Sequence, residues 1–435
     1  MKKNITKYLL LALACLGLQS CLFQEENYFD DSSANRATAD VSRCGELLKG
    51  APNGWVMEYY VGKDYSLGGI TLLCRFDGQR VTMASQMSEA DETVSSLYSV
   101  KSEQATMLSF DTYNYLVHYF GQPQGSMSDD PNGTLGGDYE FIISSASAER
   151  IELKGKKYGN RIVMKALTED QTWKQYLTKI KKVEDDAFFY EYDLLMDGLY
   201  TGQMIRSNYT FIVTYYDEIG KVHQKTVPFM FTADGLRFHE PVTIDGQTMQ
   251  NFVWKNELIS FVCTDEGATG VKLAGVYTAG YQSYDYYPGT YQMDFYRLND
   301  ETGQLEVASQ EVRLLKNEDG KSYWLKGLEY DILVMYDKPR GGLSVSPQLL
   351  KKVQGGYVYL AMWDVMNDYV LRGESIGLIS YATTNGIYLV DNGVWMGEVS
   401  GFIFGVYNSQ EEDAAFIGYT DAFASIRLVK KTIEE

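Results

Sequence analysis

Short runs of alternating apolar and polar residues fill most of this chain, and glycine, asparagine and aspartate separate them. Between residues 55 and 166 this pattern predicts eight or nine strands, including "WVMEYYV", "ITLLCRF", "YLVHYF", "RIELKG" and "NRIVMKAL". Tight turns such as the one at Asp77, Gly78 and Gln79 join neighbouring runs and favour sequential hairpins. Sequential strands with short connections form a meander, which closes most easily as a barrel.

A helix is predicted immediately before the first strand. Its apolar residues recur at three- and four-residue spacing, which gives one stripe that docks on a sheet: Ala34, Ala37, Val41, Cys44 and Leu48. Ser32 or Ser33 is expected to cap its N-terminus. Gly50 supplies the C′ position and Pro52 prevents continuation.

A second helix is predicted from Thr168 to about Phe188. One face of it is apolar: Trp173, Tyr176, Leu177, Ile180 and Val183. Thr168 and the two acids after it suit its first turn. This helix divides the chain into two β-rich parts.

The expected fold is therefore mainly β, all-β leaning towards α+β. A helix with a barrel-like meander occupies residues 33–167, a connecting helix residues 168–190, and a second β-rich lobe residues 191–435. Within that lobe, residues 227–241 and 331–347 both run strand, glycine turn, short strand and proline. Either this is a duplicated β-unit or these are two similar β-arches.

The first twenty residues have the pattern of an export signal. Three lysines precede an apolar segment at residues 8–18, which is shorter than the roughly 20 residues that a membrane-spanning helix needs. The following "LQSC" resembles the bacterial lipobox, which implies that Cys21 is diacylated and becomes the mature N-terminus. The alternative is a plain secretory signal with a chance cysteine. Residues 21–32 are polar and acidic, and are expected to form a flexible tether.

The formal net charge is −19, and removing the three lysines of the leader makes it −22. Such a chain is repelled by nucleic-acid phosphates, so nucleic acid is excluded as a partner. Beyond Cys21 the chain has Cys44, Cys74 and Cys263. This odd number without a CxxC pair favours buried, unpaired thiols, with at most one bridge.

No motif specifies a reaction. "GESIG" at 373–377 matches the spacing of a nucleophile elbow around Ser375, but the residues after it read as strands and no histidine follows His239. His118, His223 and His239 are scattered, without the short spacing that zinc ligands use. No catalytic residue is assigned, and a non-enzyme is expected.

No cofactor is expected, and calcium is the one metal for which the chain offers candidate ligands. In "SDDPNGTLGGDYE" the oxygen-bearing side chains are Asp129, Asp130, Asn132 and Asp138. Their spacing does not fit an EF-hand. The alternative is an ordinary exposed turn, which uses the same residue types.

Tyrosine is the most promising source of a binding surface. The chain has 35 tyrosines, and "YTAGYQSYDYYPGTYQMDFY" (277–296) contains seven of them. Alternation after Pro288 places Tyr291, Met293 and Phe295 on one face, and Tyr284 and Tyr286 share a face of a preceding strand. Aromatic platforms of this kind bind sugars or peptides, so Tyr284, Tyr286 and Tyr291 are the candidate ligand-binding residues. The alternative is that these rings cover the core, since tyrosine is a favoured strand residue.

Several segments appear in an order that resembles the domain of unknown function 4302 family, lipoproteins of Bacteroides-type bacteria. The segments are "GAPNGWVMEYY", "LLCRFDGQRVTM", "SLYSVKSEQATMLSFDTYN", "GGDYEF" and "ELKGKKYGNRIVM", mainly within residues 21–166. The resemblance implies an outer-membrane lipoprotein near nutrient-uptake systems built on a TonB-dependent transporter, and it supplies no catalytic residue. The acidic cluster after Cys21 resembles the surface-export signal of those bacteria: Glu25, Glu26, Asp30 and Asp31.

The leading hypothesis is a lipid-anchored, non-enzymatic protein of the outer membrane on the cell surface, with the periplasmic face as the alternative location. It would bind or present a glycan or peptide nutrient, or dock on a transporter assembly. One alternative is a glycan or peptide hydrolase that uses paired carboxylates. The other is a structural or adhesive surface protein.

Overall fold

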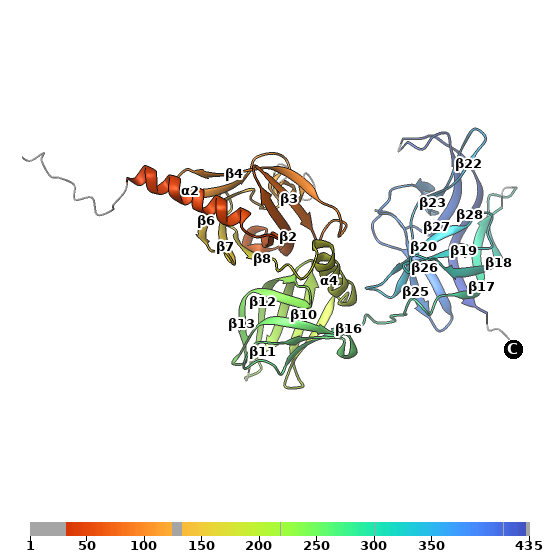
Figure 1. The fold of residues 1–435 in the computed structure, drawn as a ribbon. Helices are drawn as coiled ribbons and strands as arrows, with labels where there is room; N and C mark the ends of the chain where they lie inside the picture. The colour runs from red at the N-terminus through yellow and green to blue at the C-terminus, as the bar shows by residue number, and fades with distance from the viewer. Residues whose placement is uncertain (1–31, 124–132, 218, 300, 412, 432–435) are drawn as a thin grey trace, which may run out of the picture.

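The chain folds into two β-barrels and a third β-rich domain, joined in sequence order (Figure 1). The computed structural model describes residues 32–123, 133–217, 219–299, 301–411 and 413–431. The mainly β fold predicted from the sequence is confirmed. Within these ranges no helix is both long and apolar enough to cross a membrane.

The first barrel has eight antiparallel strands in sequence order, and its last strand pairs with its first. The strands are β1 (Trp55–Val61), β2 (Gly68–Asp77), β3 (Arg80–Ser85), β4 (Val94–Ser102), β5 (Thr106–Phe110), β6 (Glu140–Ala146), β7 (Arg150–Gly155) and β8 (Arg161–Ala166). The predicted meander is therefore confirmed. The prediction of a strand at "YLVHYF" is wrong, because α3 (Tyr115–His118) and a short 3-10 helix, η3 (Tyr119–Gly121), occupy it. Another 3-10 turn, η2 (Lys63–Tyr65), follows β1.

Strand β1 shows how the barrel is filled. Its inward side chains, Trp55, Met57 and Tyr59, are fully buried in the barrel interior. An eight-stranded barrel is just wide enough for side chains to fill. Its outward side chains include Val56 and Glu58, which are also buried because the second barrel covers that face. Burial on both faces explains why "WVMEYYV" has so little polar character.

Helix α2 (Ser33–Lys49) closes one side of the first barrel. Its cap is Ser32, whose hydroxyl accepts a hydrogen bond from the amide N–H of Asn35, as predicted. Cys44 and Leu48 are buried, whereas Ala34 is exposed, so only the C-terminal half of the predicted stripe is covered. Gly50 ends the helix in a right-handed conformation, which differs from the expected left-handed C′ residue.

Helix α4 (Trp173–Asp186) joins the two barrels. It begins five residues after the predicted start at Thr168, because Thr172 caps it and forms a reciprocal capping box with Gln175. Leu177, Ile180 and Val183 are buried in the core of the second barrel, which confirms the predicted apolar face.

The second barrel repeats the eight-stranded meander, and β16 pairs back with β9. The strands are β9 (Glu191–Met196), β10 (Leu199–Ser207), β11 (Thr210–Tyr216), β12 (Val222–Phe231), β13 (Gly235–Ile244), β14 (Gln247–Lys255), β15 (Ser260–Cys263) and β16 (Val271–Val276), with a 3-10 turn, η5 (Asn256–Leu258), before β15. Phenylalanines 211, 229 and 231 fill its interior. The lobe predicted over residues 191–435 is thus divided after β16.

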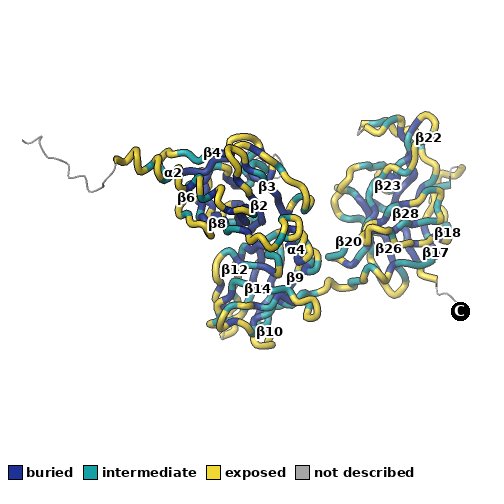
Figure 2. The backbone as a smooth tube through the Cα atoms, in the orientation of Figure 1, coloured by how far each residue is buried: buried dark blue, intermediate teal, exposed yellow. Residues whose placement is uncertain are grey.

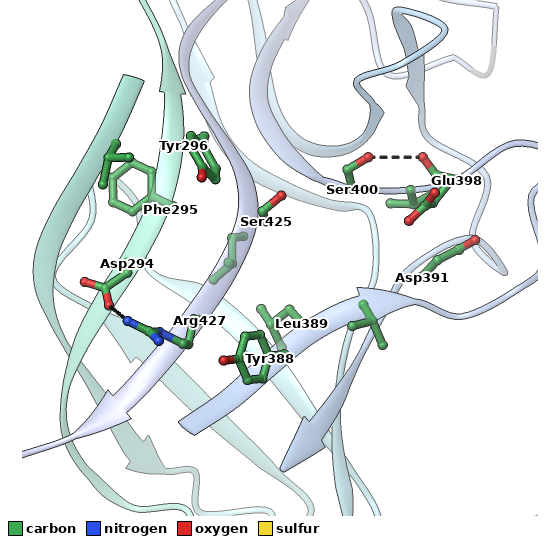
Figure 3. Close-up of a pocket in the computed structure, with 14 residues that line it drawn as sticks. Asp294, Phe295, Tyr296, Tyr388, Leu389, Asp391, Glu398, Ser400, Ser425 and Arg427 are labelled. Atoms are coloured by element: carbon green, nitrogen blue, oxygen red, sulfur yellow. Dashed lines mark hydrogen bonds and ion pairs between the residues drawn. The ribbon is translucent and has the colours of Figure 1, made fainter. Parts of the chain in front are cut away.

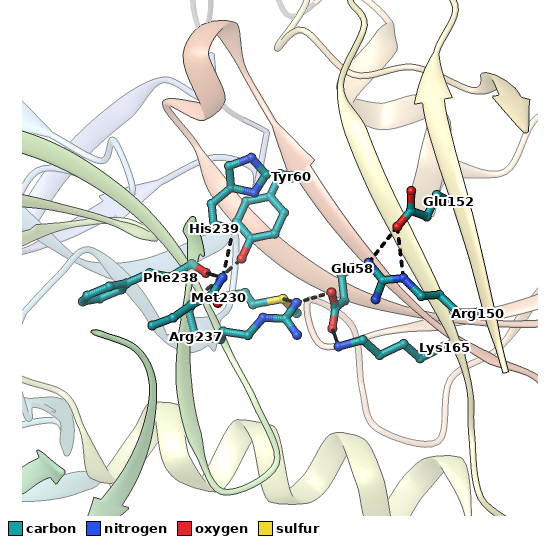
Figure 4. A network of polar contacts seen from close by, with 10 residues as sticks. Glu58, Tyr60, Arg150, Glu152, Lys165, Met230, Arg237, Phe238 and His239 are labelled. Carbon is teal, nitrogen blue, oxygen red and sulfur yellow. Dashed lines mark hydrogen bonds and ion pairs between the residues drawn. The ribbon is translucent and has the colours of Figure 1, made fainter. Parts of the chain in front are cut away.

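The two barrels meet across a polar network on β1 and β13 (Figure 4). The buried carboxylate of Glu58 accepts hydrogen bonds from the guanidinium of Arg237 and, at 2.8 Å, from Nζ of Lys165. The His239 ring packs on Tyr60 and Tyr65, with ring centroids 4.3 and 4.1 Å apart. These contacts join the barrels around the buried carboxylate of Glu58, which has two cationic partners.

The third domain is a twelve-stranded sheet in which the first strand pairs with the last. Its strands are β17 (Gly289–Leu298), β18 (Leu305–Lys316), β19 (Ser322–Lys326), β20 (Ile332–Asp337), β21 (Gly342–Val345), β22 (Gln348–Val353), β23 (Gly356–Asp364), β24 (Tyr369–Leu371), β25 (Leu378–Thr383), β26 (Gly386–Asp391), β27 (Gly401–Tyr407) and β28 (Phe416–Lys430). The echo at 227–241 and 331–347 corresponds to the hairpins β12–β13 and β20–β21, which lie in different sheets. The repeat that the structure shows is between the two barrels.

Figure 2 colours each residue by its burial and shows buried residues at the centre of each of the three units. The third domain touches the barrels beside α4. Nζ of Lys338 is 2.8 Å from the carboxylate of Asp185, and the Phe188 ring stacks on Tyr281. The segment between β16 and β17 connects the second barrel to the third domain.

Candidate functional site

A cavity of about 640 Å³ lies in the third domain, where β26 and β28 separate (Figure 3). The two strands pair only at Ile387 with Leu428 and at Tyr388 with Arg427. Beyond these pairs, β26 continues beside β25 and β28 turns towards β27. The opening between the strands forms the cavity, and residues 398–400 line its far side.

A bulge in β28 shapes the floor of the cavity. Against β17, the pairing skips from Asp294 with Arg427 to Tyr296 with Ala424, so β28 carries one extra residue. Ser425 sits in this bulge with a φ of 49°, and its amide N–H donates to the carbonyl of Ser400. A positive φ is uncommon for a residue with a side chain, and such strain clusters at functional sites. Figure 3 shows the Ser425 hydroxyl turned towards Ser400, on the open side of the strand.

One wall of the cavity carries an ion pair whose two opposite charges neutralise each other. The Arg427 guanidinium is 2.7 Å from the carboxylate of Asp294, which also accepts a hydrogen bond from Ser309. The Ser309 hydroxyl and the Arg427 guanidinium hold the pKa of Asp294 below its ordinary value. Tyr388 lies beside Arg427 on the neighbouring strand (Figure 3).

The opposite wall carries two further carboxylates, those of Asp391 and Glu398. Asp391 accepts a hydrogen bond from the amide N–H of Gly393, and among the described residues neither acid has an ion-pair partner within 4.0 Å. The loop that carries Glu398 is pinned, because Nε1 of Trp395 donates to Asp364 and the Ser400 amide donates to the Trp363 carbonyl. The backbone that carries Glu398 is therefore held, and both acids line the cavity.

The rim of the cavity is aromatic and apolar. Tyr296 is 43% exposed and Val307 is 77% exposed, and both line the cavity. Val390 also lines the cavity and is exposed. The cavity thus combines an aromatic and apolar rim, two carboxylates and one neutral ion pair.

The candidate tyrosines do not form a shared platform. Tyr291 is fully buried, and its hydroxyl donates to the carbonyl of Tyr287, so it cannot reach a ligand in solution. Tyr284 stacks on buried Tyr323 and donates to the carbonyl of Ser322. Tyr286 is exposed. The strand predicted to hold Tyr284 and Tyr286 is wrong, because residues 277–288 form turns and loops that cover the core.

Strand β17 itself follows the prediction. Its alternate residues Tyr291, Met293 and Phe295 are all buried on one face. That face is the domain core, so the alternation that suggested a binding platform describes packing instead.

Most of the predicted calcium and lipidation residues lie outside the described residues: Cys21, Asp129, Asp130 and Asn132. Asp138 is described and is buried. Its carboxylate accepts hydrogen bonds from the amide N–H groups of Lys157 and Tyr158, so it fixes a turn of the first barrel. Burial raises its pKa despite these bonds. Among the residues that the structure describes, no three His, Cys, Asp or Glu side chains gather as metal ligands would.

The remaining candidates behave as the sequence predicts. Cys44, Cys74 and Cys263 are buried and unpaired. Ser375 sits in a turn between two strands, β24 and β25, so the helix that a nucleophile elbow requires is absent at that position. His118, His223 and His239 lie in separate elements, and the ring of His223 bonds to Asp217 at 2.9 Å.

Sequence reasoning missed Tyr296, Tyr388, Asp391, Glu398 and Ser425. Tyr296 belongs to the tyrosine-rich segment, and alternation puts it on the face opposite Tyr291 and Phe295, but the pattern does not mark that face as the wall of a cavity. The others are brought to Tyr296 by the pairing of β28 with both β17 and β26. A pairing between strands more than 100 residues apart leaves no local signal in the sequence.

Comparison with known proteins finds domains of unknown function. Residues 25–256 match the family model of the domain of unknown function DUF4302, and residues 264–404 match that of a second domain of unknown function, DUF4987. The first match spans the first barrel and most of the second. No curated protein matches the chain.

Two solved structures match the chain weakly. A protein of unknown function from the DUF3598 family of Nostoc punctiforme is 8% identical and covers 56% of this chain and 98% of its own, with a TM-score of 0.14. The vaccine antigen transferrin binding protein B of Haemophilus parasuis is 11% identical and covers 87% of this chain and 75% of its own, with a TM-score of 0.13. Scores this low carry no argument about fold or function.

Proposed function

The chain belongs to the DUF4302 family, and from that premise we propose a lipid-anchored, non-enzymatic binding protein of the bacterial outer membrane, exposed on the cell surface. Its third domain would bind a glycan or peptide, or dock on a nutrient-uptake assembly such as a TonB-dependent transporter. The observation that carries the proposal is the cavity between β26 and β28.

The ends of the molecule are consistent with an anchored, outward-facing protein. The leader and the lipobox-like "LQSC" precede α2, which extends from the side of the first barrel away from the third domain (Figure 1). A diacylated Cys21 would hold that end at the membrane, because paired acyl chains suffice for stable anchoring. The third domain would then stand farthest from the anchor.

The interiors of the two barrels are filled with side chains. Trp55, Tyr59, Phe211 and Phe229 are among the fully buried side chains that fill them. The third domain instead offers a cavity whose volume falls within the usual range of small-ligand sites, about 300–1,000 Å³. A concave site with an aromatic rim and a few polar groups is typical of ligand binding.

Anchoring is tested by labelling cells with a palmitate analogue. The wild-type chain and Cys15→Ala should be labelled and should remain with membranes, whereas Cys21→Ala should be unlabelled and released. Cys15 is the matched control, because it lies within the leader itself. Protease treatment of intact cells then distinguishes the two membrane faces: resistance until the outer membrane is opened would place the protein in the periplasm.

Binding is tested with purified mature chain on arrays of glycans and peptides, together with recovery of outer-membrane partners from intact cells. Tyr388→Ala should weaken the interaction, and Tyr200→Ala, an exposed tyrosine of the second barrel, should not. Hydrolysis of an arrayed compound that Glu398→Gln abolishes would replace the binding role with that of a carboxylate hydrolase. If the arrays and the recovery from cells yield neither a ligand nor a partner, the structural or adhesive role would replace the binding role.

A further inference from the structure

We propose that the cavity between β26 and β28 recognises a positively charged group, an alkylammonium or guanidinium, carried on a ligand with apolar neighbours. This inference rests on the proposed function, since it names the chemistry of the ligand at the same site. It follows from the distribution of charge and apolar surface around the cavity.

The charges that line the cavity do not balance. Arg427 is the one cation among the lining residues, and the Asp294 carboxylate at 2.7 Å neutralises it. Asp391 and Glu398 then remain as two negative charges without a cationic partner in the described part of the chain. A ligand cation would supply that partner and would form charge-assisted hydrogen bonds, which are stronger than neutral ones.

The backbone that carries the two acids is fixed before a ligand arrives. Asp391 ends β26 and accepts a hydrogen bond from the Gly393 amide, which orients its carboxylate. Val399 is buried next to Glu398, and Trp395 ties the same loop to buried Asp364. Because this backbone is already ordered, binding costs little conformational entropy in the loop itself.

The aromatic side chains favour the same class of ligand. Tyr296 and Tyr388 line the cavity across from the two acids (Figure 3). The face of a tyrosine ring attracts a cation, and the attraction strengthens where water is partly excluded. A cation placed between the rings and the carboxylates would be stabilised from both sides.

The apolar rim distinguishes between two sources of such a cation. Val307 and Val390 line the cavity and are exposed. Their side chains suit the apolar side chains that flank a basic residue in a peptide. An amino sugar surrounds its ammonium group with hydroxyls, which find no hydrogen-bond partner on the side chains of Val307 and Val390. The structure therefore favours a lysine- or arginine-containing peptide segment.

The acidic chain assists the encounter. With a formal net charge of −19, it attracts cations over distances of about one Debye length, roughly 8 Å at physiological salt. Binding of a basic peptide should therefore weaken as the salt concentration rises.

The test uses the mature chain and three probes measured by calorimetry or fluorescence anisotropy. The first is an acetylated and amidated peptide with two lysines among valines. The second has glutamine in place of both lysines, and the third is a glucosamine oligomer. The lysine peptide should bind at least about tenfold more tightly than the glutamine peptide, because a charge-assisted hydrogen bond contributes more than a neutral one.

The decisive variant removes both carboxylates, Asp391→Asn with Glu398→Gln. It should weaken binding of the lysine peptide about tenfold or more and leave the glutamine peptide unaffected. The matched control is Glu374→Gln with Asp413→Asn, which removes two acids from elsewhere in the same domain and should change little. Circular dichroism and melting curves verify that each variant is folded.

The outcomes separate this inference from the proposed function. Equal binding of both peptides, or full binding by the double variant, overturns the cationic ligand. If a neutral glycan then binds and Tyr388→Ala abolishes its binding, the proposed function stands alone. Binding of the glucosamine oligomer without the lysine peptide would overturn the peptide source and retain the cation. Loss of every ligand and partner would overturn both proposals.

Discussion

Replacing Arg237 with alanine should weaken the contact between the two barrels more than removal of an exposed arginine does. Arg237 on β13 bonds to the carboxylate of Glu58 on β1, and Glu58 is 7% exposed. The variant leaves this buried carboxylate with Lys165 as its remaining ion-pair partner. A buried charge that loses a partner is destabilising because water cannot replace the lost interaction.

The expected loss of unfolding free energy depends on the ion-pair partner that Glu58 retains in the variant. Removing one partner of a buried ion pair costs about 3–5 kcal/mol when the other charge is left unpaired. Lys165 still neutralises Glu58 at 2.8 Å, although its side chain is 40% exposed and water screens its charge. We therefore expect the free energy of unfolding of the barrels to fall by about 2–3 kcal/mol. With a urea dependence of about 3 kcal/mol per molar, the midpoint should fall by about 1 M.

The assay is urea unfolding of the mature chain, followed by hydrogen exchange with mass spectrometry. Peptides from β1 and β13 report on the barrels, and peptides from β23 in the third domain serve as an internal reference. The matched control is Arg150→Ala, which breaks an exposed ion pair with Glu152 in the same barrel. That control should cost less than about 1 kcal/mol.

A second variant separates charge from packing. Glu58→Leu combined with Arg237→Met replaces the pair with apolar side chains, and it should recover most of the lost stability. Equal midpoints for Arg237→Ala and Arg150→Ala would refute the reasoning, because the buried pair would then contribute no more than a surface one. A double variant less stable than Arg237→Ala would refute it as well.

Thr172→Ala should lower the stability of the second barrel by about 1 kcal/mol, because the capping box of α4 loses its hydroxyl; Thr168→Ala, outside the helix, is the control in the same urea assay. Burial raises the pKa of the Cys263 thiol to about 11 and also raises that of Cys74, so neither should react with iodoacetamide at pH 8 until the chain unfolds. Mass spectrometry of the alkylated peptides measures this, and native labelling would contradict the packing. Burial lowers the pKa of His239 in the folded state, so its contribution to stability is complete above about pH 6.5 and is lost as the pH falls through the folded-state pKa. The unfolding free energy of His239→Phe should therefore decline less between pH 7.5 and pH 5 than that of the wild type, and parallel curves would count against this titration.

Local patterns predicted the first barrel well. The strands of residues 55–166 are short, alternate in polarity and are joined by tight turns, and these features determine a meander without reference to distant residues. The strand predicted at residues 115–120 was wrong, because Asn114 caps a short helix there and an apolar run of that length does not distinguish the two. The division of residues 191–435 into a barrel and a larger sheet depends on where a ladder closes, which no local signal reports.

The candidate site was less predictable than the fold. The tyrosine-rich segment does lie beside the cavity, through Tyr296, but Tyr291 is in the core. Alternation along β17 places Tyr291 on the core face and Tyr296 on the opposite face, but it does not show that the opposite face borders a cavity, which depends on the bulge in β28. Asp391 and Glu398 look like ordinary turn acids in the sequence, because their lack of cationic partners depends on tertiary contacts.

The closed ladders of the two barrels have a consequence for crowding. A barrel has no edge strand, so its backbone offers no unpaired row of N–H and C=O groups to another molecule. In the third domain β22 ends the sheet, and it carries exposed Lys351 and Lys352, the kind of charge that blocks edge-to-edge pairing. With the lipid anchor proposed above, copies of the protein would be confined to two dimensions and would meet at high local concentration. Many copies of this protein could therefore stand side by side on one membrane without their sheets joining into aggregates.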